Sequence, residues 1–161
     1  MVLVRETVDG DWRALRGIRL EALLDAPTAF ATTYQEEAAR GEEHWHRRIA
    51  RGGTFLAYVP ALSATEPAGL TGGYVIEPGT VELISMYVRP RARGRGVGEA
   101  LVEAVIGWAA ARNAASVHLW VTETNTHARA LYQRCGFALT GERQPLPSAP
   151  DLAEVALARP L

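Results

Sequence analysis

The sequence predicts a single domain of mixed α/β class. Its 161 residues suit one domain, which at this size buries about 68–70% of the surface of its unfolded chain without help from a disulfide or a metal. Runs rich in residues that favour strands alternate with segments whose apolar residues recur at helical spacing. No repeat, low-complexity tail or linker interrupts this alternation. We therefore expect one compact domain over residues 1–161.

Strands and helices already alternate in the first half of the chain. Asp9 or Asp11 is placed to cap the first helix, and Asp25-Ala-Pro27 ends it. Gly52-Gly53 closes the second, more polar helix. In order, the expected elements are a strand at Val2–Arg5, a helix ending near Leu24, a helix at Gln35–Ala50, a strand at Thr54–Val59 and a strand at Leu70–Glu77.

The centre of the chain is predicted to be a strand, a glycine-rich turn and a helix. Val81–Val88 is a short apolar run, and apolar residues recur at helical spacing from Leu101 to Trp108. Glycines that alternate in a turn let the backbone approach a ligand, and arginines before a helix are unfavourable unless an anion joins them. A tight turn with solvated arginines would explain one glycine and one arginine, but this turn has three of each. The turn therefore predicts a phosphate or pyrophosphate site. The residues concerned are Gly94, Gly96 and Gly98 with Arg91, Arg93 and Arg95.

Two common phosphate-binding motifs do not fit this turn. The Walker loop requires G-x-x-x-x-G-K-[ST], and the chain contains no lysine. The dinucleotide fingerprint requires glycine or alanine at its sixth position, where this chain has Glu99 when counted from Gly94. The pattern that remains is R-x-x-G-x-G, formed by Arg93, Gly96 and Gly98.

Shorter elements are expected after the central helix. Proline recurs between the last two strands, which predicts a loop there. The expected elements are a strand at Val117–Thr122, a helix at about Thr126–Cys135, a strand that begins at Phe137, a loop over Pro145–Pro150 and a strand at about Ala153–Arg159.

Composition excludes several function classes. A net charge of −1 gives no field that would attract nucleic acid or an anionic membrane. The one cysteine, Cys135, cannot form an internal disulfide, and the four histidines lack metal-ligand spacing. The charged start of the chain does not resemble a signal peptide, and no apolar run approaches the ~20 residues of a membrane span. We expect a soluble, cytoplasmic protein without a metal, a membrane contact or a nucleic-acid partner.

A second pattern follows the central helix. Residues 125–137 read N-x-x-A-x-x-L-Y-x-x-x-G-F, from Asn125 to Phe137. Together with R-x-x-G-x-G upstream, this chain resembles the GNAT (GCN5-related N-acetyltransferase) superfamily, most tightly from Val81 to Phe137, and looks like bacterial members of unassigned substrate. The resemblance implies a GNAT fold. That fold has a central, mostly antiparallel sheet of about seven strands, about four flanking helices, and one parallel strand pair that splays apart at the cofactor site.

The same resemblance implies acetyl-CoA as the cofactor. Backbone N–H groups from Arg93 to Gly98 would wrap the pyrophosphate, and one of the arginines would reach the 3′-phosphate. The main chain of Met86 and Val88 would bind the pantetheine amides as an added strand does, with the Val88 N–H facing the acetyl carbonyl. The candidate cofactor-binding residues are Met86, Tyr87, Val88, Arg93, Gly94, Arg95, Gly96, Val97, Gly98, Asn125 and Tyr132.

Acetyl transfer to an amine needs a base. An alkylamine with a pKa near ~10 is protonated at neutral pH, so a proton must be removed before it can attack. Glu82 is the candidate base, because burial in an apolar strand would raise its pKa and because it matches a glutamate base of some GNAT members. An exposed Glu82 paired with an arginine, and a water chain acting as base, are the alternatives. The glutamate that other members carry on the next strand is Trp120 here.

The departing thiolate also benefits from a proton. Tyr132 is the candidate acid, and the alternative is a tyrosine that only packs in the core. Asn125 is expected to cap its helix, to bind the cofactor, or both. Cys135 is expected to be a buried apolar residue, because no base lies near it in the sequence.

We interpret the chain as an acetyl-CoA-dependent N-acetyltransferase that acts on a primary amine by direct attack in a ternary complex. Phe30 and Tyr34 with the loop Asp25–Thr33, opposite a loop at Arg143–Asp151, are expected to line the acceptor site near Glu82. The sequence leaves a small-molecule amine and a peptide N-terminus open as acceptors, and it leaves a homodimer open. The alternatives are a CoA-binding regulator with little turnover, an acyltransferase for another acyl group or an oxygen nucleophile, and a dinucleotide or nucleic-acid binding module.

Overall fold

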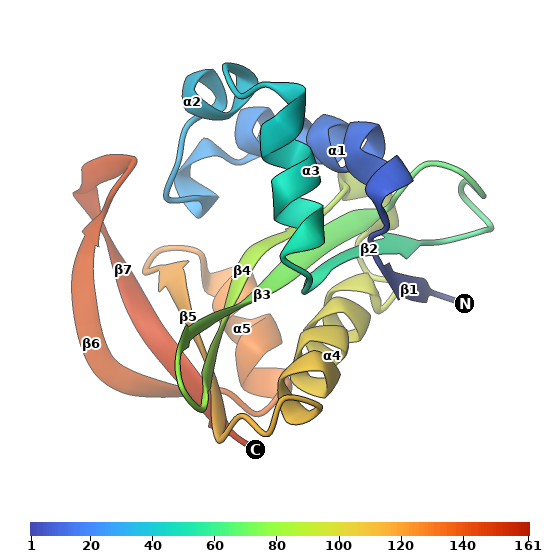
Figure 1. The fold of residues 1–161 in the computed structure, drawn as a ribbon. Helices are drawn as coiled ribbons and strands as arrows, with labels where there is room; N and C mark the ends of the chain where they lie inside the picture. Colours follow the sequence, from blue (N-terminus) through green and yellow to red (C-terminus); the bar gives the residue numbers. More distant parts are fainter.

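The computed structural model describes residues 1–161 as one seven-stranded sheet with helices on both faces (Figure 1). Neighbouring strands follow the order β1-β2-β3-β4-β5-β7-β6, and every pair is antiparallel except β4 with β5. This confirms the predicted mixed α/β class and the mostly antiparallel sheet. The strands are β1 (Leu3–Glu6), β2 (Thr54–Tyr58), β3 (Gly69–Glu77), β4 (Thr80–Val88), β5 (Ser116–Thr122), β6 (Ala138–Leu146) and β7 (Ala149–Pro160).

Five α-helices cover the sheet, and none combines the length and apolar character needed to cross a bilayer. The first three lie together on one face, whereas the fourth and fifth lie on the other (Figure 1). Short 3-10 turns occur at Asp9–Asp11, Pro27–Ala29 and Pro90–Ala92. The helices are α1 (Trp12–Asp25), α2 (Tyr34–Ala38), α3 (Glu42–Ala50), α4 (Val97–Ala110) and α5 (Thr126–Arg134).

Alternation along the strands feeds two hydrophobic cores, one on each face of the sheet. On β2, Leu56 packs with Leu15 of α1 and Trp45 of α3, while its neighbours Phe55 and Ala57 belong to the core beneath α4. Period-two alternation sends successive side chains to opposite faces, which explains this division. The sheet is thereby held rigidly from both sides.

The parallel pair separates soon after it forms. β4 and β5 pair only from Thr80 to Glu82, opposite Ser116 to His118, although both strands continue further. In β4 the backbone of Ser85 adopts φ 63°, a left-handed conformation that only a few per cent of non-glycine residues show. The register with β3 shifts at this point, so a bulge bends β4. The splayed pair implied by the resemblance is present.

Two expectations for local structure are wrong. The single helix predicted at Gln35–Ala50 is split into α2 and α3, because Gly41 is extended with ψ 170° and becomes the N-cap of the second helix. The loop predicted at Pro145–Pro150 is instead the tip of a long hairpin, in which β6 ends at Leu146 and β7 begins at Ala149. Pro145 is tolerated in β6 because β6 is the edge strand of the sheet, and Pro147 lies in the tip between the two strands.

Candidate active site

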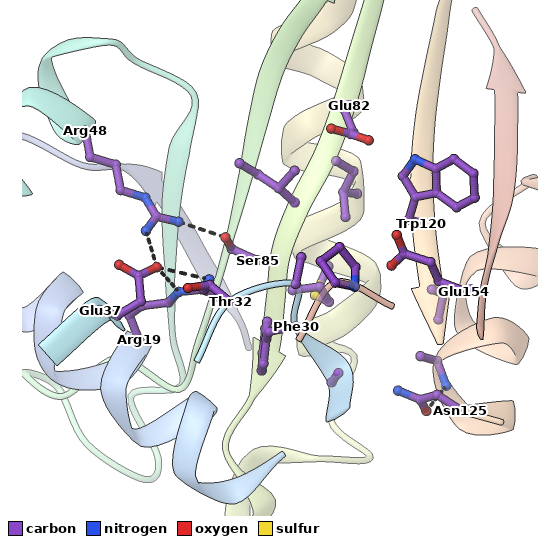
Figure 2. A pocket seen from close by; sticks show the side chains of 18 of the residues that line it. Arg19, Phe30, Thr32, Glu37, Arg48, Glu82, Ser85, Trp120, Asn125 and Glu154 are labelled. Carbon is purple, nitrogen blue, oxygen red and sulfur yellow. Dashed lines mark hydrogen bonds and ion pairs between the residues drawn. The ribbon is translucent and has the colours of Figure 1, made fainter. Parts of the chain in front are cut away.

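A cavity of about 900 Å³ lies where the ends of β4 and β5 separate. Its walls come from β4, β5, the start of α5, the segment from α1 to α3 and the hairpin of β6 and β7. Figure 2 shows Glu82 and Glu154 toward one side of this cavity and Arg19 and Arg48 toward the other. We call the first pair the acidic end and the second pair the basic end.

Glu82 lies in the wall of the cavity, on the last paired residue of β4. Its side chain is 22% exposed, and its Oε1 is 3.8 Å from Nδ1 of His118 on β5. Burial raises the pKa of Glu82, the neighbouring His118 opposes that rise, and the charge of Glu154 adds to it. The position therefore combines access to the cavity with a carboxyl group whose pKa is shifted toward neutrality.

Glu154 is a second carboxylate of the acidic end that the sequence interpretation missed. It lies on β7 opposite Thr122, is buried, and accepts a hydrogen bond of 2.6 Å from the side-chain amide of Gln144. The sequence contained an indication of this site, because Glu154 interrupts an apolar run in the same way as Glu82 does. Two carboxylates facing one cavity create a negative field that attracts a protonated amine.

Tyr132 extends from α5 to the same cavity. Its side chain is 5% exposed and packs edge-on against Phe137, with ring centroids 6.0 Å apart. Burial raises the pKa of the phenol, and no hydrogen bond to the protein contributes to that pKa. The hydroxyl therefore stays protonated at neutral pH and remains available as a donor.

Asn125 and Cys135 lie at the two ends of α5. The Asn125 side chain accepts a hydrogen bond of 3.2 Å from the Ala128 N–H, so it caps the helix while it also lines the cavity. Cys135 is buried in the core beneath α4, and burial raises the pKa of its thiol. A buried thiol with a raised pKa is a poor nucleophile, so Cys135 has a packing role.

The glycine-rich turn leads directly into α4. Gly94 and Gly96 have φ of 74° and 81°, a conformation that side chains other than glycine rarely adopt, and an added Cβ at either would meet no atom within 4 Å. The backbone N–H groups from Gly94 to Gly98 donate no hydrogen bond within the protein. Such a row of free donors at a helix N-terminus is suited to an anion.

Other residues of the turn have structural contacts. A Cβ at Gly98 would lie 2.9 Å from Cδ2 of Leu131, so this glycine permits α4 and α5 to approach each other. Nε of Arg93 donates to the Val88 carbonyl at 3.0 Å, and Nη2 of Arg93 donates to Asp25 at 3.2 Å. The Val97 side chain is buried in the core, and the Arg95 side chain is exposed.

The end of β4 presents its backbone to the gap. The Arg89 N–H donates to the Ala68 carbonyl across β3 at 2.8 Å. Because N–H groups alternate sides along a strand, the N–H of Val88 points to the opposite edge, toward the gap. Met86 lines the cavity. Tyr87 is instead buried in the core that contains the apolar residues of α1, and its hydroxyl donates to Asp25 at 3.0 Å. The side chain of Tyr87 therefore does not face the cavity.

The two aromatic residues expected at the acceptor site are separated. Phe30 lines the main cavity, and its carbonyl accepts a hydrogen bond of 2.5 Å from Ser148 at the tip of the hairpin. Tyr34 lines a smaller, neighbouring hollow together with Tyr87. The hairpin contributes Gln144 and Pro147 to the main cavity.

The basic end was not foreseen from the sequence. Arg19 of α1 and Arg48 of α3 are only 7% and 10% exposed, and both approach Glu37 of α2, at 3.3 Å and 3.8 Å. The residues come from three separate helices, so no sequence motif could have brought them together. Further cationic side chains line the same part of the cavity: Arg40, Arg47 and Arg51, with His44 beside them.

Comparisons with known proteins agree with this architecture. The model of the acetyltransferase (GNAT) family matches residues 18–137. A mycothiol acetyltransferase of Salinispora arenicola is 36% identical over 141 residues, which are 82% of this chain and 42% of that protein. The chain thus spans about two fifths of the length of this curated relative, and the same holds for the one from Salinispora tropica, at 41%.

Solved structures share the fold over nearly the full chain. A GCN5-related N-acetyltransferase from Kribbella flavida is 27% identical with a TM-score of 0.76, covering 99% of this chain and 98% of its own. A putative acetyltransferase from Salmonella typhimurium, solved with its cofactor acetyl-CoA, is 16% identical with a TM-score of 0.81, covering 100% and 94%.

Proposed function

The chain belongs to the GNAT family of acetyltransferases, and from this premise we propose that it transfers an acetyl group from acetyl-CoA to a primary amine by direct attack in a ternary complex. The observation that carries the proposal is that Glu82, with its raised pKa, and Tyr132, with its unpaired hydroxyl, line one cavity. That cavity is lined by β4, whose end leads into the turn that would hold the cofactor's pyrophosphate.

The residues of the turn and of β4 fit coenzyme A. The free N–H groups from Gly94 to Gly98 would hold the pyrophosphate. The gap edge of β4, with the N–H groups of Met86 and Val88, would hold the pantetheine arm as an added strand. The Val88 carbonyl accepts from Arg93, so of the two backbone groups of Val88 the N–H is the one left free. Acetyl-CoA would supply the reactive acetyl thioester.

The acidic end would prepare the amine. The negative field of Glu82 and Glu154 would bind the ammonium group, and Glu82 would then accept a proton from it. Because burial raises the pKa of Glu82, its carboxylate is a stronger base, and this favours the proton transfer.

Two further groups would complete the reaction. The Val88 N–H would stabilise negative charge on the acetyl oxygen during attack. The Tyr132 hydroxyl would donate its proton to the departing sulfur and would regain a proton afterwards. Each group belongs to a rigid helix or strand, which favours precise positioning.

Release of thiol from acetyl-CoA with a panel of primary amines, read alongside calorimetric CoA binding, tests this proposal. We expect CoA to bind and at least one amine to accelerate thiol release above hydrolysis. CoA binding without amine-dependent release would favour a regulatory protein of the same fold. Failure to bind CoA would overturn the cofactor assignment itself.

A further inference from the structure

The buried part of the basic end has more positive than negative charge. Arg19 and Arg48 face the single carboxylate of Glu37, so two cations share one anion. Burial lowers the pKa of Arg48 only to about 10, which leaves it charged at neutral pH. Burial also lowers the pKa of His44, which disfavours a further positive charge beside the two arginines. One positive charge in the wall of the cavity is therefore unbalanced.

Donors at the basic end are also unsatisfied. Nε and Nη2 of Arg19 both point to one oxygen of Glu37, while its Nη1 is buried without a hydrogen-bond partner. Nε2 of His44 is buried without a hydrogen bond as well, 3.6 Å from the other Glu37 oxygen. Arg48 uses Nη2 to donate to Ser85 Oγ at 2.7 Å, and it makes no other hydrogen bond. Unpaired buried donors are rare and costly, and guanidinium groups pair best with carboxylate or phosphate oxygens.

The position of Arg48 relates the basic end to the reacting amine. Ser85, which Arg48 contacts, follows Glu82 by three residues on β4. An extended strand rises ~3.3 Å per residue, so the two α-carbons are separated by at most about 10 Å, and the bulge shortens this distance. Figure 2 shows the two ends on opposite sides of the same cavity, so a small molecule can lie between them with its amine at the acidic end and a second group at the basic end.

We propose that the acceptor is an amine that also carries an anionic oxygen group, a carboxylate or a phosphate, and that this group binds to Arg19 and Arg48. The inference rests on the proposed acetyltransferase function. Its amine would lie at Glu82 and Glu154, and its anion would balance the excess charge of the basic end. The opposite polarity of the two ends would also orient the acceptor, because reversal would place like charges together.

Matched pairs of amines provide the test. Amino acids with two to six carbons between the amine and the carboxylate would be compared with their carboxamides, and phosphoethanolamine would be compared with ethanolamine. From the strength of hydrogen bonds to charged groups, we expect kcat/KM to be about 10- to 100-fold higher for the anionic member of the preferred pair. The preferred pair shows whether the anion is a carboxylate or a phosphate.

Two variants separate binding of the anion from folding. Arg48→Gln should bring the ratio of kcat/KM between the anionic acceptor and its neutral partner to about one. CoA binding in calorimetry shows whether the cofactor site of this variant is intact. Arg13→Gln removes the same charge from an exposed position of α1 outside the cavity, and it should keep the preference. Thermal unfolding of both variants shows that each is folded.

The outcomes separate the proposal of an anionic acceptor from the proposal of acetyltransferase function. Equal or better use of the neutral amines, or a preference that survives in Arg48→Gln, would overturn the anionic acceptor and leave the acetyltransferase intact. If no amine in the panel releases thiol, binding of glutarate and of inorganic phosphate to the CoA complex would be measured by calorimetry. Binding that is lost in Arg48→Gln would support the anion site, and no binding to the unsubstituted protein would overturn it.

Discussion

Replacing Tyr132 with phenylalanine removes a single oxygen atom from the cavity wall and leaves the packing of the ring unchanged. Tyr132 is 5% exposed, and its ring packs against Phe137. Its hydroxyl makes no hydrogen bond to the protein that would be lost. We therefore expect the free energy of unfolding to change by no more than about 1 kcal/mol, since no bonded partner is left unpaired. If the phenol protonates the departing thiolate, kcat should nevertheless fall by ~10²–10⁴.

Three measurements on Tyr132→Phe test this reasoning. Thiol release gives kcat, calorimetry gives CoA affinity, and denaturant unfolding gives stability. A large loss of rate with intact CoA affinity and stability is the expected result. An unchanged rate would refute the role of Tyr132 as acid, and a large loss of stability would show that the hydroxyl has a structural partner.

Three further substitutions, with Gly107→Ala as a control, test the site and the packing beside it. Glu82→Gln should slow kcat by ~10²–10⁴ and remove the acidic limb of the pH–rate profile, because activity through Glu82 rises as pH passes its raised pKa; a limb that persists would point to another base. Gly96→Val should weaken CoA binding in calorimetry by about 10-fold, because its φ of 81° strains any side chain by ~1–2 kcal/mol. Gly107→Ala, at an open position of α4, should leave CoA binding unchanged. Gly98→Val should destabilise the fold by ~1–3 kcal/mol in denaturant, through crowding against Leu131; unaltered stability would contradict its packing role.

Features that depend on local backbone chemistry were predictable from the sequence. Gly94 and Gly96 mark a turn with positive φ before a helix, and this requirement is visible as alternating glycine. Asn125 was predictable as a helix cap because its residue type and its place before a helical segment coincide. The mostly antiparallel sheet with one splayed parallel pair followed from the resemblance rather than from any single residue.

Features that depend on tertiary contact were not predictable. Arg19, Glu37 and Arg48 are surface-like residues in the sequence and become buried only because three helices pack over β4. The missed break at Gly41 is local instead, because a glycine followed by two glutamates is a recognisable start of a helix. Glu154 differs, since a carboxylate inside an apolar strand could have been recognised by the reasoning that identified Glu82.

The hydrogen bond from Ser148 to the Phe30 carbonyl joins segments 118 positions apart along the chain and forms a bridge between the hairpin tip and a residue that lines the cavity. Neither end of this bridge belongs to the two signatures that identify the family. In the proposed enzyme, exchanging residues on this bridge would reshape the acceptor side of the cavity and leave the glycine-rich turn and α5 unchanged. Choice of acceptor and grip on the cofactor would then be encoded in separate stretches of the polypeptide.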